Sequence, residues 1–594
     1  NNGPRPAAMP PVWQMPACDQ FWNVRKRNMK EEEFLMKSAK RVAALALSLA
    51  MCGTLFAGCG NNQNTPSSTN DGGAGSSHPG VLNVHIETNV QSMDPQEATD
   101  GTSFEVIASI TDGLTQPDAN GQPVAALAES WETSEDGLTW TFHLRKDAKW
   151  SSTGNPVTAN DFVYSWQRAV NPDIASEYSY MLSDIGQIVN AADIIAGTKD
   201  KSELGVEAPD DYTLVVHLNA PVAYFLSLMY FPTFYPIEQA FIENCGDTYA
   251  TSPETLQSNG AFIMESYEPS STEFTLVKNE DYWDADRVQL SQINYQLVQD
   301  NQQALLSYQG GDLDLITISG DQVDQVSSDP EFMTYNAGYL WYLTVNMQDV
   351  PELANLNLRL ALANAIDRET MMTNVVKDGS QAAYFNVPDG LATGPDGQDF
   401  RATAEDYSDV ISYEPEKAQE YLEKAKAELG VDSFEFDMIV DDDAQPQQVA
   451  TYLQEQIQST LPDVKINITI EPKKQRVLDC QSGNFEIGLT RWGPDYADPM
   501  TYLGMWRTDN NNNYGHWSNA QYDALLDDAT VGEASKDAQA RWDALHEAEA
   551  IAVRDMVIIP LYEKSNACMM KSYVSGIEFH PVALNRVYKN AVVA

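Results

Sequence analysis

Histidine, a common acid–base catalyst at neutral pH, is scattered along this chain rather than grouped. No histidine lies three or four residues from another, and the pair His546-Glu547 lacks the second histidine of a zinc-protease helix. The motifs of a serine-hydrolase elbow, a P-loop and a dinucleotide-binding turn are also missing from the sequence. A catalytic triad can also be assembled from residues that are distant in sequence, so a secreted hydrolase is kept as a competing hypothesis. The 7 histidines stand at positions 78, 85, 143, 217, 516, 546 and 580.

Metal-binding patterns are equally weak. The 6 cysteines, at positions 18, 52, 59, 245, 480 and 568, form no C-x-x-C pair and no Cys/His cluster. Residues 509–515 faintly resemble a calcium loop, but the glycine comes one place late and the twelfth position lacks glutamate, which favours a polar turn. We therefore expect neither a metal nor a cofactor. Of Cys245, Cys480 and Cys568 at least one must be unpaired, and buried free thiols are favoured.

One segment combines groups suited to ligand binding. A predicted strand at 485–489 leads directly into it, so the segment lies at the carboxyl end of a strand, where α/β sheets present ligand sites. A second acidic segment, 441–443, also follows a strand and is interpreted as a solvated loop. The candidate residues are Arg491, Trp492, Gly493, Pro494, Asp495 and Tyr496.

Hydrophobic periodicity predicts the helices and strands that must position this segment. A helix is predicted from Pro415, which suits a first turn, to Gly430, which suits a C-cap. A strand at 434–440, a helix at about 447–461 and a strand at 464–470 then form a βαβ unit, which implies a partly parallel sheet. Earlier strands are predicted at 81–86, 138–144 and 214–218, with a hairpin formed by 260–263 and 274–277.

Size and charge limit the possible partners. A chain of 594 residues is too long for one core and fits two or three lobes. With 36 Lys plus Arg against 86 Asp plus Glu, its formal charge of −50 repels nucleic acid and anionic lipid surfaces. We expect a soluble monomer.

The region around residues 36–58 is typical of an export signal. Lys37, Lys40 and Arg41 precede an apolar run at 42–58 that is slightly short for a membrane span. The run ends in LFAGC at 55–59, which resembles the bacterial lipobox and implies acylation of Cys59, although Phe56 replaces the usual leucine. An ordinary secretory signal or a membrane-anchor helix is the alternative.

The segments on either side of this signal have different interpretations. Residues 59–80 are rich in Asn, Ser, Thr, Gly and Pro and are expected to be a flexible tether. Residues 1–35 show no periodic order, and Met36 follows a segment that could encode a ribosome-binding site. We therefore interpret 1–35 as upstream sequence, with translation starting at Met36.

Several ordered motifs resemble the bacterial extracellular solute-binding proteins, family 5, the receptors of peptide and nickel importers of the ABC class. They are ALAESW at 126–131, DGLTWTFHLR at 136–145, KW at 149–150 and PVTANDFVYSW at 156–166. Weaker matches occur at 92–95, 259–262, 359–368, 560–562 and 573–576, so the resemblance covers the whole chain after the signal.

The resemblance implies an α/β, two-lobed fold like the type II periplasmic binding proteins, with an extra domain in lobe one and a hinge between lobes. It implies enclosure of the ligand when the lobes close. The corresponding ranges in this chain are 81–111, 255–336 and 561–594 for the core of lobe one, 112–254 for the extra domain and 337–560 for lobe two.

Within the family, residues 492–499 look most like the oligopeptide-binding branch, which implies that Asp495 pairs with the α-ammonium of a peptide. Trp492 and Tyr496 would wall the main-chain channel, with Gly493 and Pro494 at its edge. The alternatives are a turn-capping role for Asp495 and core packing for the aromatic residues. Some relatives place a carboxylate-binding arginine where this chain has Leu489. Arg491, on the same face of the strand, could substitute, so peptide length stays open.

The resulting hypothesis is a non-enzymatic receptor that captures short peptides and delivers them to an ABC permease driven by ATPase subunits. It would be held by Cys59 on the outer face of the bacterial cytoplasmic membrane. A receptor for a nickel chelate, a sugar or a signalling molecule is the alternative within this class.

Overall fold

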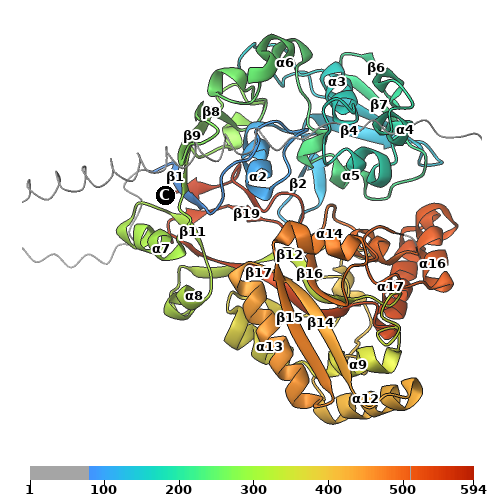
Figure 1. The fold of residues 1–594 in the computed structure, drawn as a ribbon. Coiled ribbons are helices and arrows are strands. Elements are labelled where there is room, and N and C mark those ends of the chain that lie inside the picture. Colours follow the sequence, from blue (N-terminus) through green and yellow to red (C-terminus); the bar gives the residue numbers. More distant parts are fainter. Residues whose placement is uncertain (1–78, 509) are drawn as a thin grey trace, which may run out of the picture. The chain divides into compact units, whose positions relative to one another are not determined.

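The computed structural model describes residues 79–508 and 510–594 (Figure 1). Within them, an 11-stranded sheet has the order β15-β14-β16-β12-β17-β11-β1-β10-β9-β8, with β13 paired to β17. Its strands are β1 (Val81–Ile86), β8 (Phe262–Ser266), β9 (Glu273–Lys278), β10 (Gln292–Leu297), β11 (Leu315–Ile318), β12 (Phe332–Val345), β13 (Gln381–Ala382), β14 (Phe434–Asp441), β15 (Val464–Glu471), β16 (Ile487–Trp492) and β17 (Ile559–Met570).

The remaining strands form small antiparallel sheets. A four-stranded sheet has the order β4-β5-β7-β6, and the three others are the pairs β2-β3, β18-β21 and β19-β20. These strands are β2 (Thr115–Pro117), β3 (Pro123–Ala125), β4 (Ala128–Thr133), β5 (Thr139–Leu144), β6 (Val206–Asp210), β7 (Thr213–His217), β18 (Val574–Ser575), β19 (Glu578–Phe579), β20 (Arg586–Val587) and β21 (Val592–Val593).

Helices pack against these sheets throughout the described residues, and two of them, η1 (Met181–Ile185) and η7 (Met372–Val376), are short π-helices. The α-helices are α2 (Gly101–Ile110), α3 (Ala159–Ala169), α4 (Ala191–Ile195), α5 (Phe225–Leu228), α6 (Gln239–Cys245), α7 (Asn301–Gly310), α8 (Asp321–Val326), α9 (Leu356–Asn364), α10 (Arg368–Met371), α11 (Phe400–Thr403), α12 (Pro415–Leu429), α13 (Ala444–Thr460), α14 (Lys473–Gln481), α15 (Met500–Leu503), α16 (Ala520–Val531) and α17 (Ala538–Arg554).

The βαβ unit predicted from the sequence is confirmed. β14 and β15 run parallel over their whole length, from Phe434 opposite Val464 to Asp441 opposite Glu471, and α13 connects them (Figure 1). α12 also matches its prediction, since Pro415 opens its first turn and Gly430 ends it with a φ of 71°. The left-handed conformation there costs glycine little, which explains why the helix stops at that residue.

The early strands are also confirmed. β1 pairs in parallel with both β10 and β11, while β8 and β9 form the predicted antiparallel hairpin. In β1, Leu82, Val84 and Ile86 alternate into the core with 0–3% of their surface exposed. This alternation buries one face of the strand, and the opposite face is covered as well, since His85 is 0% exposed and its Nε2 lies 2.7 Å from the carbonyl oxygen of Val298.

The four-stranded sheet is stabilised by α3, which the sequence places after the PVT segment. Thr158 and Asp161 form a capping box at the start of the helix. Trp166, later in the helix, is fully buried and donates its indole N–H to the carbonyl oxygen of Phe234 at 2.9 Å. Burial of one face and capping together fix the helix against its sheet.

β12 and β17 are the long central strands of the large sheet. Their pairing is regular from Phe332 to Asn336, is interrupted over 337–339, and resumes at Leu340. Gly338 in this bulge has a φ of 78°, and a Cβ there would lie 2.1 Å from the carbonyl oxygen of Pro581. The predicted lobe boundary at 336/337 falls within this bulge, and the lobe ranges as such stay a prediction.

The predicted limits of β16 are wrong at both ends. The strand runs over Ile487–Trp492 rather than 485–489, because it pairs with β12 up to Leu340 opposite Trp492 and Trp341 opposite Arg491. Arg491 and Trp492 therefore belong to the strand, and the candidate loop begins at Gly493. The local sequence does not contain this information, since the partner strand lies about 150 positions away in sequence.

Candidate functional site

A cavity of about 750 Å³ lies against the end of β16. On one side its lining comes from residues 133–224, which include β5, η1 and the segment before α5. On the other side it comes from residues 492–541, which include the loop after β16. The predicted site residues Trp492, Asp495 and Tyr496 line this cavity, whereas Arg491, Gly493 and Pro494 lie outside its lining.

Asp495 is the carboxylate of this cavity. Its side chain is half-buried and accepts one hydrogen bond, from the Tyr180 hydroxyl at 3.4 Å. Across residues 79–508 and 510–594, no cationic side chain forms an ion pair with it. Loss of water on burial raises the pKa of Asp495 to about 7, and the Tyr180 hydrogen bond opposes this effect. A cationic group entering the cavity would supply the missing partner and hold the carboxylate ionised.

Aromatic side chains form the walls around Asp495. Tyr496 stacks on Tyr224 with ring centroids 4.1 Å apart and an interplanar angle of 18°. Trp492 and Trp140 are half-buried, and the buried indole N–H of each has no hydrogen-bond acceptor within the described residues. The cavity therefore has apolar faces with a few polar groups, which is typical of a small-ligand site.

A buried ion pair shapes the loop that carries Asp495. Arg541 on α17 forms two hydrogen bonds of 2.8 Å with the carboxylate of Asp498, and its Nε donates to the carbonyl of Ala529 at 3.1 Å. Both side chains are less than a tenth exposed. Asp498 is thus saturated by the protein itself, and this ion pair ties the loop to α17.

Arg491 is held by other residues of the protein. Its guanidinium lies 3.1 Å from Asp441 Oδ2 and 4.7 Å above the ring centre of Trp341. Asp441 also accepts a 2.9 Å hydrogen bond from Arg476 Nε, and its side chain is 0% exposed. The interpretation of 441–443 as a solvated loop is therefore wrong for Asp441, because two arginines from later segments enclose it.

Gly493, Pro494 and Leu489 have packing environments. A Cβ on Gly493 would lie 2.4 Å from a ring carbon of Tyr339, so glycine allows this ring to approach the loop. Pro494 is buried near Gly338 of the β12 bulge. Leu489 is completely buried in the core, so its side chain does not reach the cavity.

Among the cavity residues that were not predicted from the sequence are Tyr180 and Tyr224. Both lie some 270 positions or more before Asp495, and they reach it only through the fold. Both are aromatic residues in an otherwise ordinary stretch, which gives no local sign of a binding role. The two side chains complete the cavity opposite the predicted loop.

Several predictions concern residues beyond the described part of the chain. The lipidation site Cys59, the signal at 36–58, residues 1–35 and almost all of the tether at 59–80 lie outside it. Within the described part, Cys245, Cys480 and Cys568 are free thiols, and the last two are buried as expected. No helix found there combines the length and the apolar character that a membrane crossing requires.

Comparisons with known proteins agree with this architecture. Residues 122–514 match the model of the bacterial extracellular solute-binding proteins, family 5. A dipeptide-binding protein of Lactococcus lactis subsp. cremoris is 32% identical over 572 residues, covering 94% of this chain and 100% of the relative. The oligopeptide-binding protein OppA of Bacillus subtilis is 31% identical over 549 residues, covering 89% of this chain and 94% of the relative.

A solved structure leads to the same family. Listeria monocytogenes OppA bound to peptide superposes with a TM-score of 0.69 at 34% identity, covering 87% of this chain and 100% of that one. The chain therefore belongs to the bacterial extracellular solute-binding proteins, family 5, and has their two-lobed α/β periplasmic-binding-protein fold.

Proposed function

We propose that this protein is the receptor of an ABC importer and that it captures short peptides by binding their α-ammonium at Asp495. The observation that carries the proposal is a half-buried carboxylate, facing a cavity, with a tyrosine hydroxyl as its hydrogen-bond donor and no cation of its own. An unblocked peptide brings that cation. The peptide-bound Listeria structure and the relatives named for dipeptide or oligopeptide binding support a peptide as the ligand.

The remaining recognition would fall mainly on the peptide backbone. An extended peptide forms strand-like main-chain hydrogen bonds, and these do not depend on side-chain identity. Trp492 and Tyr496 wall the cavity, while Gly493 and Pro494 hold the loop at its edge. Bridging water in a cavity of about 750 Å³ can replace direct contacts with side chains, so many sequences would be accepted.

Arg491 is assigned a supporting role in this proposal. Its ion pair with Asp441 and its stacking on Trp341 hold the end of β16, from which the Asp495 loop departs. With Leu489 in the core and Arg491 already paired, the described contacts supply no dedicated partner for a peptide carboxylate near Asp495. We therefore propose anchoring at the N-terminus, which leaves peptide length free.

Isothermal titration with two peptides tests the anchor. Asp495→Ala should weaken binding of a free-amine peptide by roughly 30-fold or more, because the ammonium is then buried without a partner. An N-acetylated twin should already bind poorly to the wild type and lose far less on mutation. Equal losses for both peptides would make Asp495 structural. Tight binding of the acetylated peptide by the wild type would exclude an N-terminal anchor.

The proposed location is the outer face of the cytoplasmic membrane, through acylated Cys59. A single acyl chain anchors only marginally, so the diacylated form is proposed. Cys59→Ser should release the protein into the medium, as measured by fractionation. Retention of the mutant in the membrane fraction would contradict the lipid anchor and favour an uncleaved signal helix.

The proposed partners are a membrane permease and its ATPase subunits, and the protein itself is not proposed to catalyse a reaction. The sequence has no P-loop, so ATP hydrolysis must come from other subunits. Deletion of the gene should abolish uptake of some peptides and leave extracellular peptide cleavage unchanged. Lost cleavage with intact uptake would favour the hydrolase instead.

A further inference from the structure

The charges that line the Asp495 cavity are unequally compensated. Four residues with charged side chains take part in the lining: Asp184, Asp495, Arg507 and Arg541. Both arginines are already paired within the protein, Arg541 with Asp498 and Arg507 with Asp527. Within the described residues, neither Asp184 nor Asp495 forms an ion pair. The cavity therefore presents two carboxylates without counter-ions.

The two carboxylates reach the cavity from two distant parts of the chain. Asp495 lies on the loop after β16 and is bonded to the hydroxyl of Tyr180. Asp184 follows Tyr180 by four residues, within η1, so the two side chains lie about one helical turn apart. Asp184 is exposed, and its main-chain carbonyl accepts a 2.7 Å hydrogen bond from the Gln187 side chain. Its carboxylate is thus free to meet a ligand near the anchored ammonium.

The aromatic walls of the cavity favour a cation as well. Trp140, Tyr180 and Tyr224 line the same cavity. An ammonium or guanidinium group over the face of an aromatic ring is attracted by the ring quadrupole. The flexible four-carbon stem of lysine can pack along such rings while its charged end reaches a carboxylate. Aromatic faces next to an uncompensated carboxylate suit a long basic side chain better than an acidic or a short polar one.

We propose that Asp184 is a specificity-determining residue that selects peptides whose first residue is lysine or arginine. The inference rests on the proposed function, because anchoring of the α-ammonium at Asp495 is what places the first side chain beside Asp184. The preferred ligand then carries two cationic groups at one end, the α-ammonium on Asp495 and the side chain on Asp184. The field of the chain, with a formal charge of −50, also attracts such peptides.

Isothermal titration with three tetrapeptides tests the preference. The first begins with lysine, the second begins with norleucine, which has a similar apolar stem and no charge, and the third carries the lysine at its last position. The wild type should bind the lysine-first peptide about 3- to 10-fold more tightly than its norleucine twin, since a partly exposed ion pair and a cation–π contact contribute together. The lysine-last peptide should show no such gain.

Variants of Asp184 separate charge selection from general damage. Asp184→Asn should abolish the lysine-first preference while the norleucine peptide binds as before, and Asp184→Lys should reverse the preference toward a glutamate-first peptide. Asp173→Asn is the matched control, since Asp173 is exposed, lies in the same region of the chain and does not line the cavity. High salt should reduce the preference.

The outcomes distinguish this inference from the proposed function. Equal binding of the lysine-first and norleucine-first peptides by the wild type, or an unchanged preference in Asp184→Asn, would overturn the role of Asp184 and leave peptide capture intact. If no free-amine peptide binds to the wild type, both the inference and the proposed function fail.

Discussion

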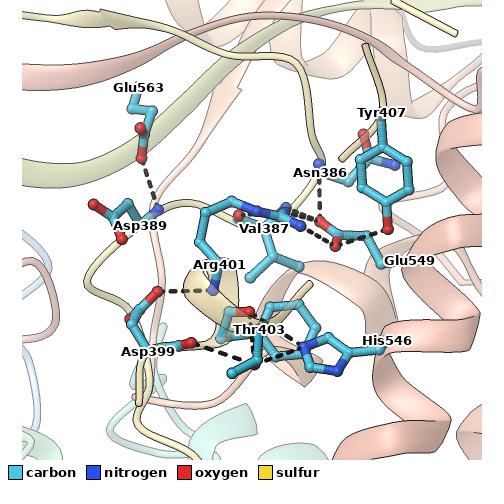
Figure 2. A network of polar contacts seen from close by, with 11 residues as sticks. Asn386, Val387, Asp389, Asp399, Arg401, Thr403, Tyr407, His546, Glu549 and Glu563 are labelled. Carbon is cyan, nitrogen blue, oxygen red and sulfur yellow. Dashed lines mark hydrogen bonds and ion pairs between the residues drawn. The ribbon is translucent and has the colours of Figure 1, made fainter. Parts of the chain in front are cut away.

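Two carboxylates of this protein, Glu549 and Asp495, have opposite environments. Glu549 on α17 is completely buried and accepts hydrogen bonds of 2.6 and 2.9 Å from Arg401 (Figure 2). The hydroxyl of Tyr407 and the main-chain N–H groups of Asn386 and Val387 also donate to it. Asp495 has the single donor Tyr180, at 3.4 Å.

This difference separates a carboxylate that the protein itself saturates from one that keeps hydrogen-bonding capacity for a ligand. The partners of Glu549 come from three short segments between 386 and 407, so its charge fixes that loop to α17 (Figure 2). A saturated buried charge has no capacity left for a ligand. Asp495 keeps that capacity. Because its ionised form is desolvated without a cationic partner, its pKa is raised to about 7.

A raised pKa alone does not identify a site, as Glu563, drawn in Figure 2, demonstrates. Burial and the neighbouring carboxylates Asp389 and Asp399 raise the pKa of Glu563 to about 7. Glu563 accepts the main-chain N–H of Asp389 at 2.8 Å and is buried beside the loop. What distinguishes Asp495 is the cavity in front of it, not the pKa shift itself.

The largest expected effect is the loss of stability caused by replacing Glu549. Glu549→Ala should lower the free energy of unfolding by about 3–5 kcal/mol, because Arg401 is left buried without its partner. Urea denaturation followed by circular dichroism measures the change. Glu547→Ala is the matched control on the same helix, since Glu547 is exposed and should change stability by less than about 0.5 kcal/mol. Comparable losses in the two variants would contradict the comparison.

Asp495→Asn should change the free energy of unfolding in the opposite direction, because it should stabilise the ligand-free protein. Because the folded protein raises the pKa of Asp495 from 3.8 to about 7, the ionised side chain destabilises the ligand-free fold, and this loss develops as pH rises from 3.8 through 7. The variant should therefore be more stable than the wild type by about 1–3 kcal/mol above pH ~7. The gain should shrink toward pH ~4, where both side chains are neutral. A destabilised variant at high pH would show that an unrecognised cation stabilises Asp495.

Peptide affinity should depend on pH through the same group. A free-amine peptide needs the ionised carboxylate, so its affinity should fall about tenfold for each pH unit below about 7. Isothermal titration between pH ~5 and ~8 measures this slope. In Asp495→Asn the slope should vanish, although binding is weak. A flat profile in the wild type would mean that the ligand does not contact Asp495.

The smallest expected effect is that of Tyr180→Phe on peptide affinity. Tyr180→Phe removes one long hydrogen bond to Asp495 and keeps the ring, so peptide affinity should change by less than about tenfold, equivalent to 0.5–1.5 kcal/mol. The pH midpoint of binding should also rise, because the hydroxyl lowers the pKa of Asp495. A change as large as that of Asp495→Ala would make Tyr180 the main anchor.

Local sequence was sufficient for the regular elements around the site. Periodicity and end signals predicted α12 between Pro415 and Gly430, and the strand–helix–strand order after it predicted that β14 and β15 run in parallel. These features depend on residues a few positions apart, and burial of one face follows directly from them. The resemblance to a family then singled out Asp495, which the fold places on the cavity.

Tertiary structure alone decided which charges are free. In the sequence Asp441 belongs to an acidic run, but in the structure Arg476 and Arg491 enclose it. Because Arg491 is paired with Asp441, it does not line the cavity. β16 extends to Trp492 because β12 pairs with it. Tyr180, Tyr224 and Asp184 meet the Asp495 cavity from some 270 or more positions away. The sequence determines the chemical type of each side chain, whereas long-range packing determines its partners. A carboxylate that is fully paired stabilises the fold, and one without a cationic partner keeps the capacity to bind a ligand.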